Sequence, residues 1–84
     1  MHEVSLVHAL FDQTDRARAD HSAACVRLLR VCIGLRSGVE VDLFTTAFEG
    51  TKAERGYSAA GLQIVSAPGR DLILERIELE VPDV

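Results

Sequence analysis

The chain has 84 residues, the length of one small domain, which excludes a two-domain enzyme with an active site between its domains. A hydrophobic content of 48% and a charged content of 26% are ordinary for a folded soluble protein and argue against disorder. Nine basic and thirteen acidic residues give a net charge of −4, which argues against nucleic-acid binding because that function needs a basic face.

The cysteines and the N-terminal segment indicate the compartment. Cys25 and Cys32 are too few for a disulfide framework and are not spaced as the Cys-x-x-Cys pairs of a structural zinc site. The longest apolar stretch, residues 28–35, is interrupted by Arg30 and is far shorter than the ~20 residues of a membrane span. Residues 1–15 contain no Lys or Arg, unlike a secretory signal. We therefore expect a soluble cytoplasmic protein with reduced thiols and no membrane partner.

The first half of the chain alternates helical and strand patterns. Apolar side chains recur at helical spacing over residues 4–21, with polar side chains on the other side, which predicts an amphipathic helix. Residues 26–34 are apolar and β-branched, which predicts a strand buried on much of both faces. A turn at residues 37–38 precedes a second predicted helix over residues 40–50, whose acidic first turn suits the helix dipole.

The second half of the chain predicts a loop followed by two strands. The loop covers residues 51–60, and the strands cover residues 62–65 and 72–81. Pro68 and Gly69 suit the two central positions of a type II turn, so we expect the last two strands to form an antiparallel hairpin. The order helix-strand-helix-strand-strand predicts an α/β (α+β) fold, a small single domain with two helices packed on a three-stranded sheet.

The last strand contains a change of parity. Ile77 and Leu79 alternate with charged residues, but Leu72 and Leu74 lie on the opposite parity. Two explanations fit this pattern: a β-bulge near Glu75, or burial of both faces early in the strand.

Three motifs occur in a characteristic order. They are the opening Met-His-Glu-Val-Ser-Leu of residues 1–6, the Ile-Gly-Leu-Arg-Ser-Gly-Val-Glu run within residues 30–40, and the Gly-Arg-Asp-Leu of residues 69–72, which leads to Ile-Glu-Leu-Glu at residues 77–80. Together they resemble the HypA/HybF family, the nickel metallochaperones of [NiFe]-hydrogenase maturation. The resemblance covers nearly the whole chain and implies the fold described above.

One feature of that family is missing. Its members carry a zinc-binding insertion with two Cys-x-x-Cys pairs, which would fall here between Pro68 and Gly69, and this chain has a short turn at that point. We therefore expect one nickel-binding-type domain over residues 1–84 and no bound zinc.

The resemblance implies a nickel site at the start of the chain. In the family the ligands are the N-terminal amine, the imidazole of the second residue and the backbone amides of the second and third residues, which correspond to Met1, His2 and Glu3. Such nitrogen ligands suit square-planar Ni(II). The first amides of a helix have no acceptor within that helix, so their deprotonation breaks no helical bond. The Glu3 carboxylate is expected to offset the positive helix end.

The remaining reactive side chains fit structural positions. His8, further along the predicted first helix, is a weaker candidate for an auxiliary ligand. His21 is expected to face solvent at a helix end. Cys32 is expected in the core and Cys25 at a strand edge or loop. No combination of residues suggests a nucleophile or a phosphate loop, so we expect no catalytic residues and no enzymatic activity.

The expected function is therefore that of a nickel metallochaperone that binds Ni(II) at its N-terminus and assists nickel insertion into [NiFe]-hydrogenase. By resemblance its partners are the accessory GTPase of hydrogenase maturation and the hydrogenase large-subunit precursor, and the protein acts as a monomer or weak dimer. The alternative is a zinc-less adaptor of the same machinery that does not itself carry nickel. The missing zinc module favours the adaptor, whereas the intact Met-His-Glu motif favours the metallochaperone.

Overall fold

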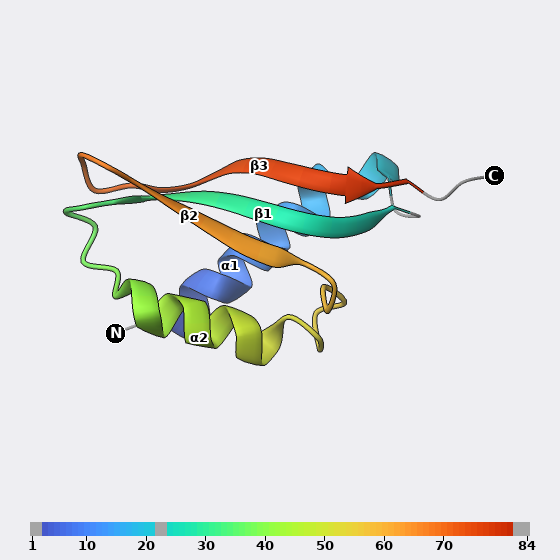
Figure 1. Ribbon diagram of the computed structural model, residues 1–84, viewed down its shortest axis with the longest axis horizontal. Helices are drawn as coiled ribbons and strands as arrows, with labels where there is room; N and C mark the ends of the chain where they lie inside the picture. The colour runs from blue at the N-terminus through green and yellow to red at the C-terminus, as the bar shows by residue number, and fades with distance from the viewer. Residues whose placement is uncertain (1–2, 22–23, 82–84) are drawn as a thin grey trace.

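A helical layer covers one face of a three-stranded sheet (Figure 1). The computed structural model describes residues 3–21 and 24–81. In chain order the elements are α1 (Glu3–Ala17), a short 3-10 helix η1 (Ala19–His21), β1 (Cys25–Gly34), α2 (Val41–Thr51), β2 (Gly61–Ala67) and β3 (Leu72–Glu80). The predicted fold class and element order are confirmed. The first helix is shorter than predicted, because the chain turns into η1 after Ala17.

The predicted hairpin between the last two strands is wrong. The strand order is β2-β1-β3, with β1 parallel to β2 and antiparallel to β3, so β2 and β3 lie on opposite sides of β1. Residues 31–34 of β1 are all buried, and such a strand gains most from the central position, where both of its edges are paired. The crossover through α2 then makes β2 parallel to β1.

The segment between β2 and β3 passes over the end of β1. The backbone N–H groups of Gly34, Leu35 and Arg36 donate to the carbonyl oxygens of Asp71, Ala67 and Gly69, each at 2.8 Å. Gly69 adopts a φ of 111°, a conformation that favours glycine. The chain therefore reverses at the Pro-Gly pair, as predicted, but the reversal joins strands that are not neighbours. Residues 68–70 form a bend, and the Ala67 carbonyl accepts from Leu35 rather than closing the predicted type II turn.

A β-bulge at Glu75 explains the parity change in β3. Arg30 of β1 pairs with Arg76, and the next residue, Val31, pairs with Leu74, so Glu75 has no pairing partner in β1. The first of the two explanations is therefore confirmed. Because of the bulge, four leucine and isoleucine side chains from both halves of β3 pack against the core, namely Leu72, Leu74, Ile77 and Leu79.

Aromatic rings connect the two helices to the turn before β2. Phe11 stacks on Phe48, with ring centroids 5.3 Å apart, and on Tyr57, with centroids 5.1 Å apart. All three rings are buried. Cys32 is buried and Cys25 is exposed, both as free thiols and both as predicted. Among the described residues, no helix is long and apolar enough to cross a bilayer.

Candidate metal centre

Of the three predicted nickel residues, Glu3 is described, whereas Met1 and His2 lie outside the described residues. Glu3 is the first residue of α1, and only 5% of it is exposed. Its Oε2 accepts a hydrogen bond from the backbone N–H of Glu40 at 3.1 Å. Glu40 is the N-cap residue of α2. The side chain of Glu3 is thus directed to the start of the second helix.

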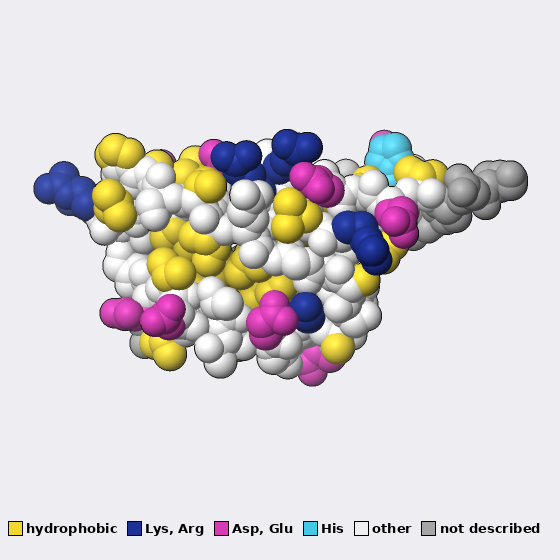
Figure 2. All heavy atoms as spheres, in the orientation of Figure 1, with side chains coloured by type: hydrophobic (Ala, Val, Ile, Leu, Met, Phe, Trp, Pro, Cys, Tyr) yellow, Lys and Arg dark blue, Asp and Glu magenta, His cyan; other side chains and the backbone are white. Residues whose placement is uncertain are grey.

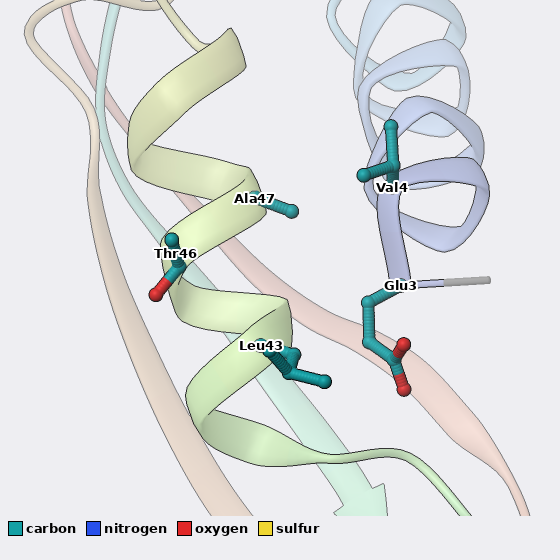
Figure 3. A pocket seen from close by; sticks show the side chains of 5 residues that line it. All are labelled: Glu3, Val4, Leu43, Thr46 and Ala47. Atoms are coloured by element: carbon teal, nitrogen blue, oxygen red, sulfur yellow. The ribbon is translucent and has the colours of Figure 1, made fainter. Parts of the chain in front are cut away.

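A pocket of about 310 Å³ lies between the first turn of α1 and the side of α2 (Figure 3). Leu43 and Ala47 point from α2 toward α1, and Val4 faces them from α1. Glu3 and Thr46 are its polar lining residues. Val4 and Leu43 remain 54% and 57% exposed, so apolar surface is open to solvent directly beside the predicted nickel motif.

Acidic side chains occur on both helices that border this pocket. Residues 1–15 and 37–51 contain no Lys or Arg, and Figure 2 shows acidic side chains along α2. Basic side chains from the turns after α2 balance part of this charge, because Lys52 pairs with Glu49 and Arg55 pairs with Asp12 and Asp15. The acidic residues of the two segments are Glu3, Asp12, Asp15, Glu40, Asp42 and Glu49.

His8 takes part in a network that sequence reasoning missed. Nδ1 of His8 lies 3.0 Å from Nη1 of Arg55, which also donates to the His8 carbonyl at 3.3 Å. A guanidinium can only donate, so this Nδ1 is an acceptor and is occupied by Arg55. Nη2 of Arg55 donates to Asp12 at 2.6 Å and to Asp15 at 3.2 Å. The hydrogen bond to Asp12, followed by the other contacts with these carboxylates, raises the pKa of Arg55 above its ordinary value, although desolvation opposes the shift.

Tyr57 completes this network from the turn before β2. Its hydroxyl donates to Asp15, and burial together with this hydrogen bond raises the pKa of Tyr57 above its ordinary value. The network ties the outer face of α1 to the turns that follow α2. The spacing of Asp12 and Asp15 on one helix face is the signal that could have predicted a basic partner.

Within residues 3–21 and 24–81, no three His, Cys, Asp or Glu side chains are grouped so as to hold a metal ion. The nickel site expected at Met1, His2 and Glu3 remains a prediction, and within it the structure describes the contact of Glu3 with Glu40.

Comparisons with known proteins identify the family to which the chain belongs. A family model described as "Hydrogenase/urease nickel incorporation, metallochaperone, hypA" matches residues 1–72. The hydrogenase maturation factor HypA of Shewanella baltica is 41% identical over 69 residues, which are 81% of this chain and 58% of that protein. HypA of Campylobacter jejuni is 41% identical over 49 residues, which are 58% of this chain and 43% of that protein. The chain thus spans about half the length of the curated relatives it matches.

The fold is similar to that of solved HypA structures. The solution structure of the Ni metallochaperone HypA from Helicobacter pylori matches with a TM-score of 0.72 at 23% identity, covering 96% of this chain and 97% of that one. A further solution structure of HypA protein matches with a TM-score of 0.65 at 23% identity, covering 98% and 97%. At this identity the likeness concerns the fold, and the family is shown by the model that spans most of the chain. The chain belongs to the HypA family of nickel-incorporation metallochaperones.

Proposed function

We propose that this protein is a nickel metallochaperone that binds Ni(II) at Met1, His2 and Glu3 and assists nickel insertion during [NiFe]-hydrogenase maturation. One observation carries the proposal: the match to the nickel-incorporation family begins at residue 1 and so includes the Met-His-Glu motif. Matched relatives named as hydrogenase maturation factors support the hydrogenase as the destination.

The coordination chemistry follows from the order of donor atoms along the chain. The amine of Met1 and the amides of His2 and Glu3 are successive backbone nitrogens, so they close small chelate rings, and the imidazole of His2 adds a further ring. Ni(II) accepts such square-planar nitrogen coordination. A histidine at the second position closes fewer unstrained rings than one at the third, which suits a protein that must also release its metal.

The proposed role is to hold and transfer nickel without a catalytic step. The partners we propose are the accessory GTPase of hydrogenase maturation and the hydrogenase large-subunit precursor. We further propose that residues 1–84 act as one nickel-binding domain without the zinc insertion between Pro68 and Gly69. The backbone hydrogen bonds that hold residues 67–71 on the end of β1 support a closed turn at that point.

A second candidate function is that of an adaptor that does not carry nickel. It is favoured by the absence of Cys-x-x-Cys pairs from the sequence. An adaptor has no physical need for a histidine at the second position, so the two functions predict different nickel affinities.

Calorimetric nickel titration of four untagged proteins tests the proposal. These are the parent, a variant with one residue added before Met1, His2→Ala, and His8→Ala as the control histidine. The added residue converts the Met1 amine into an amide, a far poorer ligand. We expect the first two variants to lose at least ~100-fold in affinity, because loss of a mere outer-shell partner already costs up to that much. His8→Ala should bind nickel as the parent does. Equal affinity in all four proteins would leave the adaptor as the better account.

A further inference from the structure

The starts of both α-helices meet at one carboxylate. α1 begins at Glu3, and α2 begins at Val41 after the N-cap residue Glu40. The backbone N–H of Glu40 donates to Oε2 of Glu3, although the two residues are 37 positions apart. Figure 3 shows the Glu3 carboxylate directed from α1 toward the segment that enters α2. Each helix start carries about half a positive elementary charge, so this carboxylate lies where two such charges converge.

Glu3 supplies to α2 a contact that helices usually supply to themselves. In a capping box, a glutamate in the first turn accepts a hydrogen bond from the N-cap N–H of its own helix. The side chain of Glu40 makes no cap hydrogen bond, and the carboxylate that binds its N–H comes from α1. The contact therefore holds the first turn of α1 against the first turn of α2.

The Glu3 carboxylate is buried and therefore depends on its hydrogen bond and on nearby positive charge. Glu3 is 5% exposed, and a buried carboxylate is costly unless hydrogen bonds and positive charge compensate it. The Glu40 N–H and the two helix starts provide such compensation. The backbone of Glu3, which carries one of the proposed nickel ligands, is thereby fixed in place.

We propose that the Glu3 side chain is a positioning residue for nickel. Its hydrogen bond to Glu40 fixes the backbone that binds the metal, and its charge neutralises two helix starts that would otherwise repel a divalent cation. The nitrogen atoms remain the ligands. This inference rests on the proposed function.

Two substitutions separate the hydrogen bond from the charge. Glu3→Gln keeps an acceptor oxygen but removes the charge, whereas Glu3→Met keeps the volume and removes both. Asp42→Asn is the matched control, because Asp42 is an exposed acidic residue in the first turn of the same helix α2. Each variant is measured by urea unfolding without metal, by calorimetric nickel titration and by the visible absorption spectrum of the nickel complex.

We expect Glu3→Gln to unfold near the parent's urea midpoint but to bind nickel 10- to 100-fold more weakly, the range typical of lost outer-shell partners. Its spectrum should match the parent's, because the nitrogen donors are unchanged. Glu3→Met should lose both stability and nickel affinity. The control Asp42→Asn should keep more of the parent's nickel affinity than Glu3→Gln does.

Two results would overturn the inference. An altered spectrum in Glu3→Gln would make the carboxylate a ligand, and parental affinity in both Glu3 variants would remove its role in nickel binding. If the parent shows no nickel binding that depends on His2, the proposed function fails and the inference fails with it. Binding that depends on His2 but not on Glu3 removes the inference alone.

Discussion

Gly34 and Gly69 meet backbone to backbone at the end of β1. A Cβ atom placed on Gly34 would lie 2.4 Å from the carbonyl oxygen of Gly69, closer than side-chain carbons approach a backbone oxygen. The segment that joins β2 to β3 can lie across the end of β1 because residue 34 has no side chain.

Gly34→Ala is therefore expected to lower the free energy of unfolding by about 1–3 kcal/mol, the usual cost of overpacking. Urea unfolding measures the change. Gly50→Ala is the control, since a Cβ there has no neighbour within 4 Å and the residue lies in α2. That substitution should stabilise the protein by up to about 1 kcal/mol. A Gly34→Ala protein as stable as the parent would show that the crossing segment can move aside.

Arg55→Lys should destabilise the protein by about 1.5–3 kcal/mol, the range for hydrogen bonds to charged groups. The guanidinium contacts Asp12, Asp15 and His8 at once, whereas an ammonium is a point charge that cannot span them. Arg76→Ala is the matched test of an exposed ion pair, because Arg76 and its partner Glu78 are 60% and 44% exposed. Its effect should stay below ~1 kcal/mol. Equal effects of the two substitutions in urea unfolding would contradict a special role for the Arg55 network.

We expect the protein to lose stability at alkaline pH as the Tyr57 hydroxyl ionises. Its pKa is raised in the folded protein by burial and by the hydrogen bond to Asp15. The contribution of Tyr57 to the free energy of unfolding is therefore fully present below the unfolded pKa of about 10. It is lost as the pH rises through the folded pKa. Tyr57→Phe should unfold with a flatter pH dependence above pH 10. The sequence has one tyrosine, so the tyrosinate absorbance reports this group alone, and a midpoint at or below 10 would contradict the prediction.

Nickel affinity should fall steeply as the pH drops below neutrality. Imidazole, amine and amide nitrogens must all be unprotonated to bind a metal, so each bound nickel releases protons. Calorimetric titration across this pH range measures the effect. An affinity that stays constant from mildly acidic to mildly alkaline pH would indicate carboxylate ligands instead.

Zinc analysis tests the proposed domain organisation. Protein purified without chelator should contain no stoichiometric zinc, because the sequence has no Cys-x-x-Cys pair. Its circular dichroism should be unchanged by EDTA, since the core consists of buried aromatic and aliphatic side chains. One tightly held zinc per chain, or unfolding on chelation, would contradict this organisation.

The helices and strands could be predicted from the sequence because their signals are local. The apolar spacing in α2 and the parity change at Glu75 each lie within a few residues. The first predicted the helix, and the second left two explanations open, one of which was the observed bulge. The strand order could not be predicted in the same way. A Pro-Gly turn reverses the chain equally well between neighbouring strands and across a third strand, and the choice depends on how β1 is buried.

The candidate site could be predicted only in part, because its contacts also join residues that are far apart in the sequence. The family motif indicates Met1, His2 and Glu3, but the contact between Glu3 and Glu40 joins residues 37 apart. The contact of Arg55 with Asp12 joins residues 43 apart. Such pairs form when helices pack together, and a single sequence carries no periodic signal for them.

The central place of β1 also sets the order in which the molecule can be completed during synthesis. Both of its partners come later in the chain: Leu28 pairs with Gly61, and Val26 pairs with Leu79. During synthesis β1 therefore emerges from the ribosome before either of the strands that pair with it. Long-range strand pairing of this kind is slow, because the intervening chain must close a large loop before any contact forms. The sheet is thus completed only after β3 has been made, although its central strand is made before both of its partners.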